Sequence, residues 1–219
     1  MTLRAVGFDL DETLAVPVRD RETLLREATS DVDAPDLTRS SYLDAHGRHL
    51  TRESRTPIFA DLLDDHDAAV DPTRLAAAYR ERIADSLALL DGTERLLDGL
   101  RRDYRVGLLT NGPVVAQRDK LDVLGLTDAF DASLVSGELT AGKPDERAFA
   151  ALVDALDVDA DEAVYVGDDP EADVRGASQA GLRAVQVVYD GGPEPSPLAD
   201  AHVERSSLVA TLPDLVQSL

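Results

Sequence analysis

A pair of aspartates near the start of the chain, Asp9 and Asp11, offers the first residues that could do chemistry. They end and follow a short apolar run over residues 4–9, which predicts a buried strand. Because alternate residues of a strand share a face, both carboxylates can point the same way, and their repulsion then requires a cation or a shared proton. One carboxylate could attack phosphorus while the other handles the leaving group's proton. The alternative, in so acidic a chain, is an acidic surface turn.

A second polar cluster, Thr110-Asn111-Gly112, follows the apolar run at residues 105–109. A hydroxyl, an amide and a glycine backbone can all donate hydrogen bonds to phosphoryl oxygens, so the cluster is a candidate phosphate-binding site. The same three residues also make an ordinary turn.

A third candidate is Lys143, which follows the apolar run at residues 132–135 and is one of only two lysines in the chain. A compact ammonium charge suits a phosphate clamp. Pro144 fits the first turn of a helix that begins near Asp145. The alternative is a surface lysine at a helix start.

A fourth cluster holds Asp168, Asp169 and Asp173, directly after the apolar run at residues 163–166. Several carboxylates within six residues indicate a cation site, and hard oxygen ligands favour Mg²⁺. The alternative is an acidic helix N-terminus, which the helix dipole favours.

The elements that must position these clusters alternate along the chain. A further apolar run at 184–188 completes about five strands, and helical patterns separate them at 93–103, 114–124, 145–156 and 171–181, with a last helix near 206–218. This order predicts an α/β fold with a parallel sheet and helices on both faces. Ligands bind such sheets at the carboxyl ends of the strands, so all four clusters should face one crevice.

Residues 15–91 interrupt the alternation and contain no convincing strand. Helical spacing is seen near 20–31, 36–50, 55–67 and 72–89. A helical block inserted after the first strand would lie over that strand's carboxyl end, which predicts a cap over the site. The chain then divides into a catalytic core, 1–14 and 92–219, and a cap, 15–91. The alternative is an ordinary helical subdomain packed on the core.

The charge and composition of the chain limit the classes of partner that we expect it to have. The chain has 22 basic and 43 acidic residues, a net charge of -21, and such a field should repel nucleic acid. It has no cysteine, which excludes disulfides and thiolate sites. No apolar run reaches the roughly 18 residues that span a bilayer, and no signal peptide is evident, so we expect a cytoplasmic protein without a membrane partner.

The balance of cations is unusual, because arginine supplies every basic residue except Lys120 and Lys143. Abundant aspartate with scarce lysine resembles the proteins of salt-accumulating halophiles, in which salt screens the self-repulsion. A halophilic origin is therefore a hypothesis.

The segments FDLDETL, LLTNG, GKPDERAF and VYVGDDPEADVRGASQAGLRAV together resemble the haloacid dehalogenase superfamily in order and spacing. The resemblance implies a Rossmann-like core with a mobile helical cap inserted after the first strand. It implies that Asp9 is a nucleophile that becomes an aspartyl-phosphate. It also implies that Asp11 is the general acid/base, with its backbone carbonyl on magnesium.

The same resemblance gives roles to the later clusters. Thr110 and Lys143 should bind the transferring phosphoryl group, and Lys143 should neutralise the nucleophile's charge. Asp168 should be the second carboxylate on magnesium, with Asp169 as a substitute or support. Asp173 should lie outside the metal ligands, oriented toward Lys143.

The function that follows is a magnesium-dependent phosphatase of small phosphorylated metabolites, as a monomer or a homodimer. A non-catalytic or regulatory module on the same fold is the alternative, and phosphomutases share these motifs. A metal-free 2-haloacid dehalogenase is disfavoured by the paired carboxylates. In the cap, four residues could meet an anionic substrate or lie on a solvated helix surface: Arg48, His49, Arg52 and Arg55.

Overall fold

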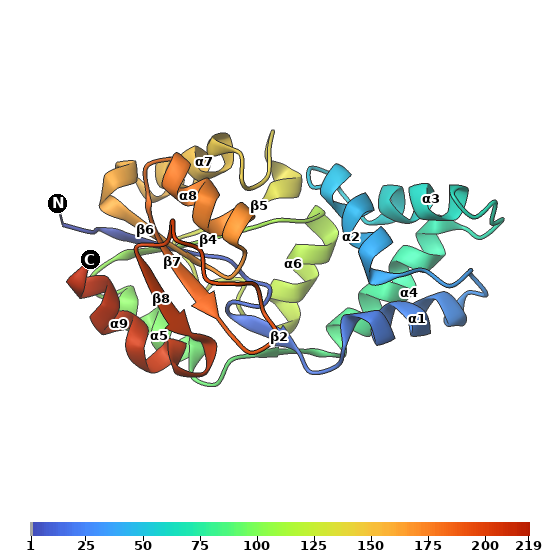
Figure 1. The fold of residues 1–219 in the computed structure, drawn as a ribbon, viewed down its shortest axis with the longest axis horizontal. Coiled ribbons are helices and arrows are strands. Elements are labelled where there is room, and N and C mark those ends of the chain that lie inside the picture. Colours follow the sequence, from blue (N-terminus) through green and yellow to red (C-terminus); the bar gives the residue numbers. More distant parts are fainter. Residues whose placement is uncertain (1) are drawn as a thin grey trace.

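The computed structural model describes residues 2–219, which form a parallel sheet beside a lobe of helices (Figure 1). The sheet has six strands in the order β5-β4-β1-β6-β7-β8, and every neighbouring pair is parallel. Their bounds are β1 Ala5–Phe8, β4 Arg105–Thr110, β5 Ala132–Val135, β6 Ala163–Gly167, β7 Arg183–Val188 and β8 Ala201–Glu204. Every residue of β1 is buried because β1 lies inside the sheet between β4 and β6, with helices over both faces.

Helices cover both faces of the sheet, as the alternation of elements predicts. Val6 and Phe8 of β1 pack into one hydrophobic cluster, whereas Ala5 packs into another on the opposite face. The first cluster includes side chains from α5 (Thr93–Leu100), α6 (Val114–Val123) and α9 (Leu208–Ser218). The second includes side chains from α7 (Glu146–Leu156) and α8 (Gly176–Gln179).

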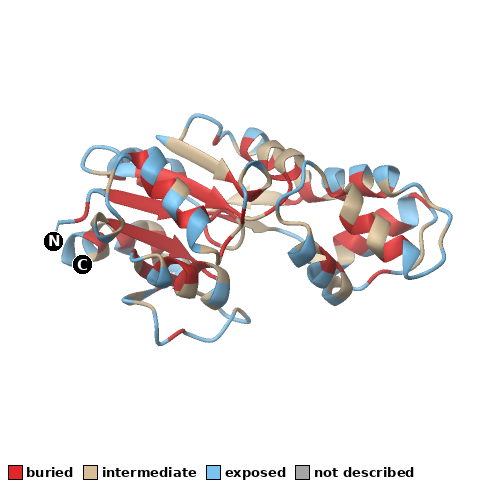
Figure 2. Cartoon of the chain, turned by 90° about the horizontal axis from the view of Figure 1, so that it is seen from above, coloured by how far each residue is buried: buried red, intermediate tan, exposed pale blue. Residues whose placement is uncertain are grey.

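The remaining helices form a lobe with a hydrophobic core of its own, which runs from Leu24 to Ile83. We call this the helical lobe; it consists of α1 (Arg21–Asp31), α2 (Arg39–Arg48), α3 (Thr56–Asp64) and α4 (Pro72–Ala84). Figure 2 shows buried residues inside the sheet and again inside the lobe, with a narrow connection between them.

That connection contains a small antiparallel pair, β2 (Ala15–Pro17) with β3 (Leu87–Leu89). The expectation of no strand between residues 15 and 91 is therefore wrong. Each strand has three residues, too few to show an alternating pattern, and the two partners are far apart in sequence. The predicted helix 72–89 ends as α4 at Ala84, and its last residues form β3 instead.

Two further differences concern the C-terminal half. The sixth strand, β8, was not predicted because it lies at the sheet edge and has only one buried residue. The predicted helix 171–181 is a π-helical turn, Pro170–Arg175, followed by the short α8. Short 3₁₀ turns occur at Ser136–Glu138, Ala160–Glu162 and Arg205–Ser207. Among residues 2–219, none of the helices combines the length and the apolar character that a bilayer span needs.

Candidate active site

The four sequence clusters meet at one edge of the sheet. Asp9 directly follows β1, Thr110 ends β4, Lys143 follows β5, and Asp168 directly follows β6. These four strands are neighbours in the order β5-β4-β1-β6, so their carboxyl ends bring the side chains together. All four residues line one cavity of ≈ 700 Å³, whose other wall comes from the helical lobe.

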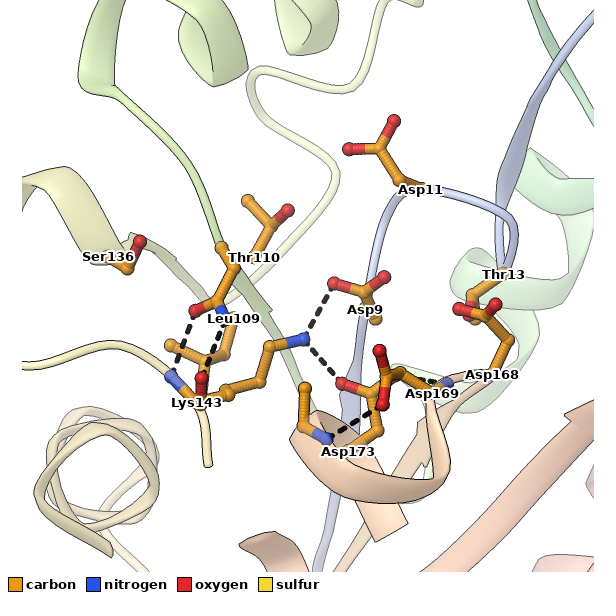
Figure 3. A network of polar contacts seen from close by, with 12 residues as sticks. Asp9, Asp11, Thr13, Leu109, Thr110, Ser136, Lys143, Asp168, Asp169 and Asp173 are labelled. Atoms are coloured by element: carbon orange, nitrogen blue, oxygen red, sulfur yellow. Dashed lines mark hydrogen bonds and ion pairs between the residues drawn. The ribbon is translucent and has the colours of Figure 1, made fainter. Parts of the chain in front are cut away.

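Lys143 lies at the centre of a hydrogen-bond network in the site (Figure 3). Its Nζ donates to Asp9 Oδ1 at 2.7 Å, to Asp173 Oδ1 at 2.6 Å and to the Tyr165 hydroxyl at 2.8 Å, which uses all three of its hydrogens. Burial lowers its pKa, but Asp173 and Asp9 outweigh burial and hold the pKa well above its usual value. Lys143 is therefore a fixed cation, and the Asp173 carboxylate is oriented toward it.

Asp9 is buried next to this cation. Burial raises its pKa to about 7, with further increases from Asp173 and Asp11, and Lys143 opposes the change. A carboxylate in this position gains more from a second nearby cation than an exposed one would, because its charge is poorly solvated.

Asp168 completes a group of three carboxylates. One carboxylate oxygen from each of Asp9, Asp168 and Asp173 lies within 4.8 Å of the others. Burial and the charges of Asp173 and Asp9 raise the pKa of Asp168 to about 8, although Tyr189 donates a hydrogen bond of 3.1 Å to it. Hard oxygen donors that repel one another this strongly fit a divalent cation such as Mg²⁺.

Asp169 lies apart from this group. Its carboxylate accepts hydrogen bonds from the backbone of Glu171 at 2.8 Å and Ala172 at 2.9 Å, so it caps the turn that follows β6. The structure therefore places Asp168, and not the exposed Asp169, beside Asp9.

Asp11 turns away from Asp9, as Figure 3 shows. Its carboxylate accepts hydrogen bonds from Lys120 Nζ at 2.6 and 2.8 Å, from Arg21 at 2.7 Å and from Gln117 at 3.0 Å. Burial favours a higher pKa, but the two cations hold the pKa of Asp11 far below its usual range. The expectation that both carboxylates point the same way is not met, because β1 ends at Phe8 and Asp11 lies in the following turn.

Thr110 and Asn111 have different surroundings. Gln117 donates from Nε2 to Thr110 Oγ1 at 2.6 Å, which leaves the threonine hydroxyl hydrogen available as a donor. Asn111 donates to the Lys143 carbonyl at 2.8 Å and accepts from the Lys143 backbone N–H at 2.9 Å. Its side chain therefore positions Lys143, and a direct contact with phosphate stays a prediction.

Sequence reasoning missed several residues of the site. Gln117 and Lys120 lie three positions apart on α6, on one helix face, and the rarity of lysine was a signal for Lys120. Arg21, Tyr165 and Tyr189 gave no such signal, because their partners are distant in sequence.

The four lobe residues that could meet an anionic substrate differ in their surroundings. Arg48 and His49 both contact Asp61, and Arg52 is exposed. Only Arg55 is buried and lines the cavity.

Comparison with known proteins identifies the family. A model of the haloacid dehalogenase-like hydrolases matches residues 3–181. A phosphoserine phosphatase of Thermus thermophilus is 41% identical over 148 residues, which make up 65% of this chain and 59% of that protein. A phosphoglycolate phosphatase of Rhodospirillum rubrum is 32% identical over 199 residues, or 88% of this chain and 82% of that protein.

A solved structure agrees in fold. The HAD-hydrolase YfnB of Bacillus subtilis, bound to magnesium, aligns with a TM-score of 0.74 and 23% identity over 98% of this chain and 100% of that chain. The matched family model, the two phosphatase relatives and this fold confirm the resemblance seen in the four sequence segments. The chain belongs to the haloacid dehalogenase-like hydrolases.

Proposed function

We propose that this chain is a magnesium-dependent phosphatase of small phosphorylated metabolites that acts through an aspartyl-phosphate on Asp9. One observation carries the proposal: Asp9 is buried at a strand end between a fixed ammonium and two further carboxylates, and it lines a cavity. The relatives named above are phosphatases, which supports the same reaction.

Asp9 and Asp168 would hold the metal, with the Asp11 backbone carbonyl as a further predicted ligand. When bound, Mg²⁺ supplies charge neutralisation to the carboxylates and to the phosphoryl group. Asp173, whose Oδ1 is bonded to Lys143 and whose Oδ2 accepts from the Asp169 backbone, would keep these side chains in position.

The protein's own groups account for the attack. A carboxylate oxygen of Asp9 would form a bond to phosphorus as the bond from phosphorus to the leaving-group oxygen breaks. Lys143 would offset negative charge on the nucleophile and the transferring group, and the Thr110 hydroxyl would donate to a phosphoryl oxygen. Water would then hydrolyse the aspartyl-phosphate and release inorganic phosphate.

Asp11 would give a proton to the leaving-group oxygen and later take one from water. In the present arrangement its ion pairs with Lys120 and Arg21 keep it ionised. Arg21 belongs to α1 of the helical lobe, so movement of the lobe would alter the proton affinity of Asp11. We therefore propose that the lobe is a cap, whose closure would also exclude water from the cavity.

The test is hydrolysis of p-nitrophenyl phosphate by the purified protein. We expect turnover with Mg²⁺, loss of turnover with EDTA, and loss by several orders of magnitude in Asp9→Asn, because the amide cannot form the acyl phosphate. Asp214→Asn, an exposed aspartate of α9, is the matched control and should keep full activity. Retained turnover in Asp9→Asn would rule out the covalent mechanism. Halide release from 2-haloacids in EDTA would favour a dehalogenase instead.

A further inference from the structure

Three cationic side chains are buried among residues 2–219: Lys120, Lys143 and Arg55. Lys120 pairs with Asp11, and Lys143 pairs with Asp9 and Asp173. Arg55 is 7% exposed and forms no ion pair with any residue that the structure describes. In a chain with a net charge of -21, a buried cation without a carboxylate partner stands out.

The contacts of Arg55 leave most of its hydrogen-bonding capacity unused. Its Nε donates to the Tyr42 hydroxyl at 2.9 Å, and its Cζ lies 5.3 Å from the centroid of the Tyr79 ring. A guanidinium carries five N–H donors, and both of these partners are neutral. Removing a charge from water without a counter-charge is costly, so this position favours an anion supplied from outside the chain.

A second arginine contacts the same two tyrosines. Arg39 donates to the Tyr79 hydroxyl at 3.4 Å, and its Cζ lies 5.1 Å from the centroid of the Tyr42 ring. Its guanidinium also has no acidic partner among the described residues. Arg39 and Arg55 line the same cavity as Asp9, so the lobe presents two unpaired guanidinium groups to the site.

The cavity that Arg39 and Arg55 line is also lined by Asp11 and Lys120. Burial together with the charges of Arg55, Lys120 and Arg39 lowers the pKa of His46 to about 3, with Asp11 opposing, so His46 is neutral. Burial and the charges of Arg21 and Arg55 lower the pKa of Lys120 to about 8, although Asp11 raises it. Arg55 therefore faces the same cavity as Lys120, the residue that binds Asp11.

The phosphoryl group itself has other partners. In the proposed function Lys143 and Thr110 receive it, and Asp11 faces the leaving group. The two lobe arginines are then left for a different part of the substrate, the part that departs with the leaving-group oxygen.

We infer that Arg55, assisted by Arg39, binds a carboxylate on the leaving group, so that the preferred substrates are phosphate monoesters of small hydroxy acids. The planar fork of a guanidinium matches a carboxylate in two parallel hydrogen bonds. This inference rests on the proposed function and adds to it the chemical class of the substrate.

A matched pair of esters tests the inference: 3-phosphoglycerate and glycerol 3-phosphate share a carbon skeleton and differ in one carboxylate. We expect kcat/KM to favour the acid by about 10- to 100-fold, as hydrogen bonds to a charged group typically contribute. Arg55→Gln and Arg39→Gln should reduce that ratio, mainly through KM. Arg55→Lys should recover part of it, because charge returns without the fork. Arg52→Gln, an exposed arginine three positions earlier, should leave the ratio unchanged.

The outcomes separate this inference from the proposed function. Equal kcat/KM for the two esters, with p-nitrophenyl phosphate still hydrolysed, would overturn the inference alone. No hydrolysis of any of the three esters would overturn both. A preference for 1,3-propanediol bisphosphate over 3-hydroxypropyl phosphate, without a preference for the acid, would reassign the anion as phosphate and reject the carboxylate. If Arg55→Gln loses its cooperative melting transition, its kinetics reflect misfolding. The kcat/KM ratios of Arg55→Lys and Arg39→Gln then test the inference in its place.

Discussion

Charge at single residues is arranged unevenly across the cavity. Asp9, Asp168 and Asp173 form an anionic cluster around Lys143, whereas Asp11 accepts hydrogen bonds from two cations and from the neutral Gln117. Two carboxylates two positions apart in sequence thus have opposite pKa shifts, because one is buried among acids and the other is paired with Lys120 and Arg21. Such opposed environments suit a nucleophile and an acid/base with different duties.

These shifts predict a pH-dependent stability of the metal-free protein. The folded-state pKa values of Asp9 and Asp168, about 7 and about 8, exceed the ordinary 3.8, so the native state binds more protons than the unfolded state between those limits. In EDTA the free energy of unfolding should therefore fall by on the order of 1 kcal/mol between pH about 6.5 and 7.5. His46 affects the stability only below this window, because its pKa changes from an ordinary 6.5 to about 3 on folding.

Chemical denaturation at both pH values, with EDTA or Mg²⁺, measures the effect. Mg²⁺ should stabilise more at the higher pH, because it binds the deprotonated carboxylates. In Asp168→Asn the fall in EDTA should be smaller than in the wild type. A wild-type stability that rises across this window in EDTA would contradict the assigned shifts.

At the scale of elements, the packing at the end of β6 leaves no room for a side chain at Gly167. At the end of β6, a Cβ on Gly167 would lie 2.3 Å from Asp173 Oδ2 and 2.4 Å from its Cγ, closer than real Cβ atoms come. Asp173 cannot move away freely, because it is buried and bonded to Lys143 and to the Asp169 backbone. The close approach of β6 to this carboxylate therefore requires glycine.

Gly167→Ala should lower kcat by more than about tenfold and destabilise the fold by about 1–3 kcal/mol, the usual range for overpacking. Gly99→Ala is the matched control, because nothing lies within 4 Å of its Cβ position in α5. That variant should be slightly stabilised, by about 0.5–1 kcal/mol, and keep full activity. Thermal melting and p-nitrophenyl phosphate turnover measure both variants, and an unaffected Gly167→Ala would show that Asp173 need not stay in place.

The whole molecule combines two hydrophobic cores with a strong surplus of acid. The sheet and the helical lobe have separate clusters, joined by β2, β3 and the side chains around the cavity. A net charge of -21 works against this compact arrangement through self-repulsion.

Salt should therefore stabilise the protein. The screening length falls from about 10 Å at 0.1 M to about 3 Å at 1 M, which weakens repulsion between exposed carboxylates more than it weakens buried pairs. We expect the melting temperature to rise with KCl over this range, with an equal osmolality of sorbitol as the control. A melting temperature that stays level or falls in KCl would reject the halophile hypothesis.

Much of the fold followed from local pattern. The apolar runs at β1, β4, β6 and β7 were found because strands buried on both faces are largely continuous in apolar residues. The edge strand β5 was found from a short run although only one of its residues is buried. Each site cluster follows β1, β4, β5 or β6 in the chain. The β2–β3 pair and the edge strand β8 were not predicted, because three or four half-exposed residues are too few to show a recognisable hydrophobic period. The cap role of the lobe stays a prediction.

For the site, the sequence alone determined which strands Asp9, Thr110, Lys143 and Asp168 end or follow, because each of these residues comes soon after its strand in the chain or at its end. Only the tertiary structure decided which of these carboxylates share one space and which are neutralised. The pairing of Asp11 with Lys120 joins residues 109 positions apart, and no local pattern encodes such a contact. The same holds for the unpaired burial of Arg55, since a missing partner is defined by everything packed around a side chain. Sequence fixes what lies beside a residue along the chain, whereas charge balance depends on what lies beside it in space.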